Sequence, residues 1–168
     1  MKHSQIVSQL LLGVMLVGGM DASLAGEPQV VAANLHIAPA TATGRQEPLP
    51  QMTPDIARGP GGVLYVVWAE GREQRFNVRL TSSTDGGKTF SAPVHVNGPH
   101  EQAVAGWQEG PQVALDAQGT VFVLWLGAHE GGIRLARSTD GGKTFSRSIR
   151  VGQAVKARQV YPSLAVDP

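Results

Sequence analysis

The chain has 168 residues, of which 42% are hydrophobic and only 16% are charged. This balance excludes a disordered polyelectrolyte, and 21 glycines with 11 prolines favour short strands joined by turns over a helical protein. A formal net charge of +1 gives no field that would attract nucleic acid, and the absence of cysteine excludes disulfides, iron–sulfur clusters and thiolate zinc sites. We therefore expect no nucleic-acid partner, no cofactor and no metal.

Residues 1–25 have the pattern of a secretory signal peptide. A basic start at Lys2 precedes an apolar core at 10–17, and small residues at Ser23 and Ala25 suit a signal peptidase. A membrane span needs about 20 apolar residues, and Asp21 interrupts this one too early. The sequence predicts cleavage near Ala25, a secreted or periplasmic protein, and no membrane contact after cleavage. Residues 26–51 are rich in alanine and proline and are predicted to be a linker or a closing strand.

An internal repeat organises the rest of the chain. The octapeptide Ser-Thr-Asp-Gly-Gly-Lys-Thr-Phe at 83–90 recurs unchanged at 138–145. Flanking segments also match in pairs, 54–57 with 111–114 and 62–68 with 119–125, and a further copy begins at 162–167. A repeat of this length indicates stacked supersecondary units, each of which needs a neighbour to bury its apolar face.

Each unit is predicted to contain four strands. In the second unit the runs rich in β-branched and aromatic residues, or with alternating apolar residues, are 112–116, 120–126, 133–138 and 147–151. Four antiparallel strands per repeat describe a blade of an all-β propeller. The predicted units are blade 1 at 52–98, blade 2 at 110–152, and the first strand of a third blade at 161–168.

The octapeptide fits the pattern Ser-x-Asp-x-Gly-x-Thr-Phe and so resembles the Asp-box, the repeat of bacterial neuraminidases (BNR repeat) in the sialidase-like superfamily. The resemblance implies a propeller of about six blades, with the box at the hairpin between the third and fourth strands. Two blades and the start of a third are then present, and the remaining blades are needed for closure. The box residues are expected to be structural: Ser83, Asp85, Gly87, Thr89 and Phe90, and Ser138, Asp140, Gly142, Thr144 and Phe145.

A ligand site is expected at the end of the blades opposite the octapeptides. Strands that run up and down place the second-to-third and blade-to-blade connections together, at 69–76, 97–110, 127–132 and 153–161. Irregular loops on a rigid scaffold are where function concentrates, and a mixture of arginine, carboxylate and aromatic groups suits a sugar acid. The expected substrate-binding residues are Glu70, Arg72, Trp107, Glu109 and Arg158.

The resemblance to sialidases is closest at Ala-Glu-Gly-Arg, residues 69–72, and implies that Arg72 binds substrate. Two other family features are replaced. Met52-Thr53-Pro54 stands in place of Arg-Ile-Pro, so the carboxylate-binding arginine is absent. Phe76 or Asn77 falls where the acid/base aspartate would be, and neither transfers a proton at neutral pH. The family's nucleophile comes from later blades, so we assign no catalytic residue.

Three functions remain open from the sequence. The first is a secreted propeller that recognises a glycan or another extracellular ligand without chemistry of its own. The second is a divergent exo-α-sialidase or other glycoside hydrolase whose remaining catalytic residues lie in further blades. The third is a structural or protein-binding propeller.

Overall fold

The computed structural model describes residues 49–73, 75–106, 109–128, 132–152 and 162–167. These residues form two four-stranded antiparallel sheets, so the expectation of an all-β chain is confirmed. The predicted signal peptide, nearly all of the predicted linker, and the end residues 161 and 168 of the predicted third unit lie outside the described residues. In the described ranges the single helical element is the short 3-10 turn η1 (Pro60–Gly62), and no helix is long and apolar enough to cross a membrane.

Both sheets have their strands in sequence order. The first sheet contains β1 (Gln51–Arg58), β2 (Leu64–Arg72), β3 (Arg75–Ser83) and β4 (Val94–His95). The second sheet contains β5 (Gln112–Leu115), β6 (Val121–Leu126), β7 (Ile133–Ser138) and β8 (Ile149–Val151). The third predicted strand of the second unit therefore has its predicted bounds, and the other three are shorter than predicted.

The turn before β6 explains one of these shorter strands. Asp116 Oδ1 accepts hydrogen bonds from the backbone amides of Gln118, at 3.1 Å, and Thr120, at 2.7 Å. A short carboxylate side chain that binds nearby amides competes with the sheet for those donors. The amide of Thr120 is therefore used in the turn, and the strand begins one residue later, at Val121.

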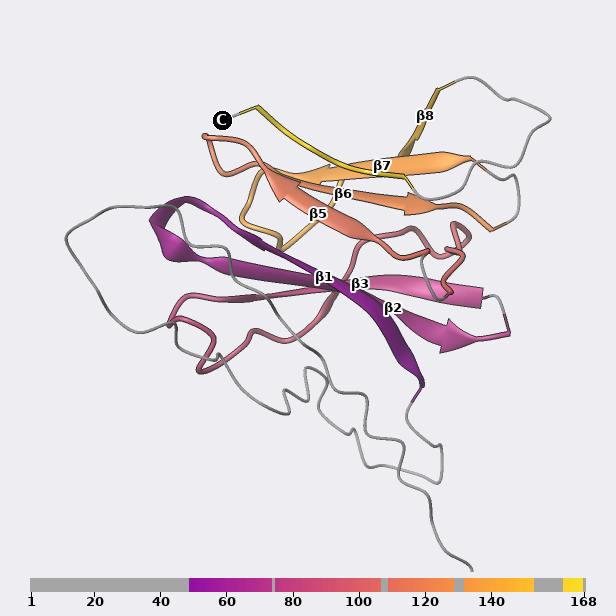
Figure 1. Cartoon of the computed structure of the whole chain (residues 1–168), viewed down its shortest axis with the longest axis horizontal. Helices are drawn as coiled ribbons and strands as arrows, with labels where there is room; N and C mark the ends of the chain where they lie inside the picture. Colours follow the sequence, from indigo (N-terminus) through magenta and orange to yellow (C-terminus); the bar gives the residue numbers. More distant parts are fainter. Residues whose placement is uncertain (1–48, 74, 107–108, 129–131, 153–161, 168) are drawn as a thin grey trace, which may run out of the picture.

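The two sheets stack face to face, with the second above the first in Figure 1. The core between them is built from alternating residues, as a strand with one buried face requires. The largest contributors from the first sheet are Tyr65, Val67, Phe76, Val78 and Leu80, and from the second Val113, Val121, Val123 and Trp125.

In this stacking the two sheets pack through faces that are not equivalent in the repeat. Trp125 lies in the core between the sheets, whereas Trp68, which has the same place in the first repeat, lies on the other face of β2. The core face of β2 is instead formed by the alternate residues Tyr65, Val67 and Ala69. The units therefore stack head to tail, because two units related by a twofold axis would bury equivalent faces against each other.

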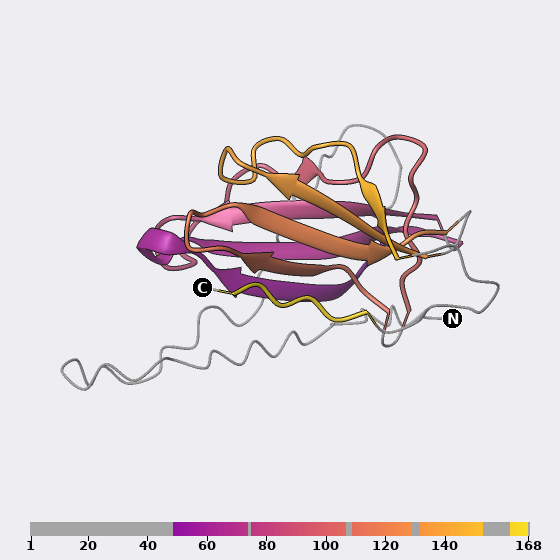
Figure 2. The same ribbon diagram turned by 90° about the horizontal axis from the view of Figure 1, so that it is seen from above.

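A hydrogen bond between neighbouring units is repeated along the chain. Asp55 Oδ2 accepts from the amide of Val113 at 2.9 Å, and Gln112 Oε1 accepts from the amide of Leu164 at 2.7 Å. Each acceptor directly follows the matching proline of its repeat. Residues 162–167 thus hold the same relation to β5 that β5 holds to β1. The three segments lie one above another in Figure 1 and run along the same edge in Figure 2. We call this repeated contact the inter-sheet clasp.

The two octapeptides form the same closed turn. Ser83 Oγ donates to Asp85 Oδ1 at 2.8 Å, while the amide and hydroxyl of Thr89 donate to the two oxygens of Asp85 at 2.9 and 2.6 Å. Ser138, Asp140 and Thr144 repeat these bonds. The Thr89 and Thr144 hydroxyls, aided by the other donors, hold the pKa of each aspartate well below its usual range.

The space beside the second turn is tightly filled. Gly142 has a φ of 83°, and a Cβ built on it would lie 2.9 Å from Leu80 Cδ2. Phe145 packs against the core between the sheets, and Phe90 is partly buried. The second turn therefore contributes to the contact between the two sheets.

Candidate functional site

The segment predicted as a loop at 69–76 is almost entirely strand. β2 continues to Arg72 and β3 begins at Arg75, with these two residues paired across the ladder. A Cβ on Gly71 would lie 2.1 Å from the carbonyl oxygen of Arg75, so only glycine fits this narrow hairpin. The loop prediction was wrong because glycine and charged residues are typical of loops, whereas here they are paired in the two strands of a tight β-hairpin.

The hairpin at Arg72 and the octapeptide turns lie at opposite ends of the sheets. Arg72 pairs with Arg75 at one end of the β2–β3 ladder, and Leu64 pairs with Ser83 at the other. The irregular connections therefore lie at one end of the first sheet, while the octapeptide turn and η1 lie at the other (Figure 1).

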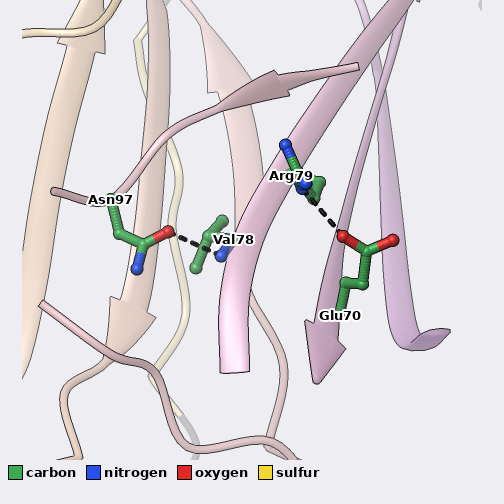
Figure 3. A network of polar contacts seen from close by, with 4 residues as sticks. All are labelled: Glu70, Val78, Arg79 and Asn97. Carbon is green, nitrogen blue, oxygen red and sulfur yellow. Dashed lines mark hydrogen bonds and ion pairs between the residues drawn. The ribbon is translucent and has the colours of Figure 1, made fainter. Parts of the chain in front are cut away.

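The structure places three of the five expected binding residues. Arg72 is exposed at the end of β2. Glu70 is bound internally, because its Oε2 lies 2.9 Å from Arg79 Nε (Figure 3). Glu109 lies in the connection from β4 to β5, where its backbone carbonyl accepts a hydrogen bond from Gly106. Trp107 and Arg158 lie outside the described residues.

The first strand is distorted at Met52-Thr53-Pro54. The register between β1 and β2 shifts between Met52 and Asp55, and Thr53 has a φ of 49°. Positive φ is unusual for a β-branched residue. Gly110 packs directly against this bulge, since a Cβ there would lie 2.5 Å from Thr53 Cβ. The bulge therefore fits against the chain that enters β5.

The connection at 97–110 joins the two sheets at the hairpin end. Ala103 exchanges backbone hydrogen bonds with Phe76, at 3.3 and 2.8 Å, and pairs on its other side with Gly127. Asn97 fixes the start of the connection, because its Oδ1 accepts from the amide of Val78 at 2.7 Å (Figure 3) and its Nδ2 donates to the carbonyl of Glu101 at 2.8 Å. These bonds hold a long connection in a defined position.

A hollow of about 300 Å³ lies between this connection and the second sheet. We call it the rim hollow, and it is lined by His100, Glu101, Gln102, Gly127, Ala128, Arg134 and Arg147. The Glu101 carboxylate accepts a hydrogen bond from the amide of Gly98 at 3.2 Å, so it also serves its own loop. The size is at the lower limit for sites that take small molecules.

The second sheet concentrates positive charge beside the rim hollow. Arg134 of β7 lies directly opposite Arg150 of β8, and like charges in this position oppose each other. The matching pair in the first sheet is Arg79 and His95. Burial lowers the pKa of His95, the charge of Arg79 lowers it further, and Glu70 acts in the opposite direction. The basic pair of the first sheet therefore includes a histidine beside Glu70, and that of the second sheet consists of two arginines.

The rim hollow is lined by two arginines, which can bind an anion, and by the carboxylate of Glu101. Guanidinium groups match carboxylate and phosphate oxygens through paired hydrogen bonds. Among the described residues no group of three or more histidine, aspartate or glutamate side chains could hold a metal ion. Phe76 is buried, and Asn77 pairs with Glu70 in the ladder. Neither side chain carries a proton to transfer at neutral pH.

Sequence reasoning missed Arg79, Arg134 and Arg147 as members of the site region. The signal was present in the aligned repeats, where Gly127 falls at the position of Glu70 and Arg134 at the position of Arg79. The two otherwise similar units therefore differ at this position, with glutamate in the first and glycine in the second.

The chain resembles known proteins only to a limited extent. No family model and no curated protein matches the chain. Among solved structures it is similar to a protein of unknown function from Dyadobacter fermentans, with 24% identity over 56% of this chain, and to the Hadza microbial sialidase Hz136, with 20% identity over 60%. The TM-score is 0.48 in both cases, and the chain spans only 26% and 25% of those proteins. At these values the activity of either whole protein gives no evidence for this chain.

Proposed function

We propose that these residues belong to a secreted, sialidase-like propeller that recognises a glycan or another extracellular ligand at its hairpin end. In this proposal each sheet is a blade and each octapeptide an Asp-box. The proposal includes no catalytic step for this chain, since neither Phe76 nor Asn77 can replace an acid/base carboxylate.

The propeller architecture is supported by the head-to-tail stacking and by the inter-sheet clasp. A contact that recurs between successive units in the same sense allows further units to be added, and a ring of such units leaves no open face. Leu124 and Leu126 are buried on the face of β6 turned away from the first sheet, which shows that this face too is suited to packing.

The observation that carries the function is the contrast between the two ends of the sheets. One end repeats the same octapeptide turn, with the same hydrogen bonds in both copies. The other end has connections of different length, fixed by Asn97 and Ala103 around a charged hollow. Ligand sites are commonly built from loops of this kind on a rigid scaffold.

The test uses the protein of the full reading frame on a glycan array, followed by calorimetric titration of any glycan that binds. Arg147→Ala, which removes a charge from the rim hollow, should weaken binding about tenfold or more. Lys88→Ala, an exposed change in the octapeptide at the opposite end, should leave the affinity within about threefold. The proposal would be contradicted if no glycan on the array bound the protein, or if the two variants lost affinity equally. Turnover of a sialoside by the same protein would favour the hydrolase alternative instead.

A further inference from the structure

Each octapeptide contains an aspartate followed directly by a glycine, and no other Asp-Gly pair occurs in the sequence. The two pairs are Asp85-Gly86 and Asp140-Gly141. In such a pair the glycine amide can attack the aspartate side chain, because glycine has no Cβ to shield its nitrogen and leaves the backbone free to turn. The product is a five-membered succinimide ring. These two aspartates are therefore the ones in the chain that are chemically most open to this self-modification.

The reaction is a loss of water. The glycine nitrogen forms a bond with Cγ of the protonated carboxyl group, one Cγ–O bond breaks, and the departing hydroxyl leaves as water with the amide proton. Water then adds to one of the two ring carbonyls and opens the ring to aspartate or to isoaspartate, so nothing is oxidised or reduced. An ionised carboxylate that is held in place reacts slowly, because it is a poor electrophile and has a poor leaving group.

The octapeptide turn holds its carboxylate in this unreactive form. The amide of Thr89 donates to Asp85 Oδ1 at 2.9 Å, and the Thr89 hydroxyl donates to Oδ2 at 2.6 Å. Thr144 binds the two oxygens of Asp140 at 3.0 and 2.6 Å. The threonine hydroxyl is the main cause that holds the pKa of each aspartate well below its usual range. Both oxygens are thus occupied, and protonation is opposed.

Burial does not protect these pairs. Asp85, Gly86, Asp140 and Gly141 are all exposed to solvent. A Cβ built on Gly86 would have no atom within 4 Å, so no neighbouring segment restrains this part of the first turn from outside. The hydrogen bonds within each octapeptide are therefore the contacts that limit the reaction.

We propose that Asp85-Gly86 and Asp140-Gly141 are latent succinimide sites, which the threonine hydroxyl of the same octapeptide keeps unreactive. The octapeptide then preserves its own covalent structure in addition to closing the hairpin. This inference goes beyond the proposed function, since it depends neither on a ligand nor on the number of sheets.

The experiment incubates the full chain at pH 5 and measures isoaspartate at each site by enzymatic methylation and peptide mapping. Thr89→Val keeps nearly the same shape but loses the hydroxyl, so it should raise isoaspartate formation at Asp85 about tenfold or more and leave Asp140 within about twofold. Thr144→Val should give the reverse result. Thr89→Ser keeps the hydroxyl and should stay within about threefold of the wild type.

Asn97-Gly98 provides an internal reporter of general unfolding. An Asn-Gly pair forms the same ring with loss of ammonia, but Asn97 is 5% exposed and its side-chain amide is bonded to Val78 and Glu101. Deamidation of Asn97 should therefore stay slow in the threonine variants. The wild-type protein in urea gives the unprotected rate at all three sites.

Three results would overturn the inference. The first is isoaspartate formation in the folded wild type as fast as in urea. The second is an unchanged rate at Asp85 in Thr89→Val. The third is a rise at Asp140 and Asn97 together with Asp85 in that variant, which would trace the effect to unfolding of the whole chain rather than to the loss of one hydroxyl.

Discussion

At the scale of single residues, Asp85 and Asp140 show how a short motif fixes a turn. Each carboxylate accepts hydrogen bonds from an amide and a hydroxyl of the threonine four residues on. These donors favour the ionised form, so the pKa of each aspartate is lower in the folded protein than in the unfolded chain. The turn is therefore coupled to pH.

The first prediction concerns acid stability. Because the folded pKa is depressed, the two carboxylates contribute stability above their unfolded pKa of about 3.9, and this contribution is lost as pH falls below it. Asp85→Asn with Asp140→Asn should lower the thermal midpoint at pH 7, and the difference from the wild type should shrink toward pH 3. Lys88→Ala, in the same turn, is the control. A difference that stays constant from pH 7 to pH 3 would show that the carboxylates are not responsible.

A second prediction compares two adjacent glycines. Gly141 and Gly142 both have positive φ, at 74° and 83°, so alanine at either should cost about 1 kcal/mol from the backbone. Gly142→Ala should cost about 1–3 kcal/mol more, because its Cβ would lie 2.9 Å from Leu80 Cδ2. A Cβ on Gly141 would have Tyr65 Oη as its nearest neighbour, at 3.8 Å. Urea unfolding of the two variants measures the difference. Equal losses of unfolding free energy in the two variants would mean that Leu80 moves to make room for the added methyl group.

At the scale of elements, β2 and β3 form the longest paired segment among the described strands, and their outer flank carries the Arg79–Glu70 pair. Glycine at position 71 lets the two strands approach closely at the hairpin. This approach keeps Glu70 within the ladder, where its carboxylate reaches Arg79 rather than solvent. Glu70 is thus a partner of Arg79 in this sheet, and its binding role stays a prediction.

A third prediction follows from this ion pair. Glu70→Gln should lower the free energy of unfolding by about 1–3 kcal/mol, because Arg79 keeps its charge in a partly buried position. The same change should lower the pKa of His95 further, since Glu70 acts to raise it. Urea unfolding and a proton NMR titration of His95 measure the two effects. A folded variant with an unchanged His95 pKa would show that the carboxylate does not act on this cluster.

At the scale of the whole molecule, the units are related by repetition of one contact. Asp55 and Gln112 each bind the backbone amide of the next unit's first segment. Because Val113 is 6% exposed, its amide has no ready access to water when the acceptor is removed. The inter-sheet clasp therefore links the position of one sheet to the position of the next.

A fourth prediction tests the inter-sheet clasp. Asp55→Ala should lower the free energy of unfolding by about 1–3 kcal/mol and speed the hydrogen exchange of the Val113 amide. Asp55→Asn keeps an acceptor oxygen and should restore most of the protection. Gln112→Ala should have the same effect on the amide of Leu164 and little effect on that of Val113. Loss of protection at both amides in each variant would indicate general loosening rather than two separate contacts.

The sequence alone determined the all-β class, the repeated unit and the place of the octapeptides in β-hairpins. These features depend on local chemistry: alternating apolar residues for strands, glycine for positive φ, and a carboxylate that binds amides a few residues away. Strand ends were less predictable, as at Thr120, where a side-chain contact competes with the ladder.

Only the tertiary structure decided which residues meet. It showed that Glu70 binds Arg79, that Ala103 joins the two sheets, and that Arg134 stands beside Gly127 at a hollow. The physical reason is that these contacts depend on the register between strands and on the path of a long connection. A shift of one residue in register would turn strand side chains such as Glu70, Arg79 and Arg134 to the other face of their sheets.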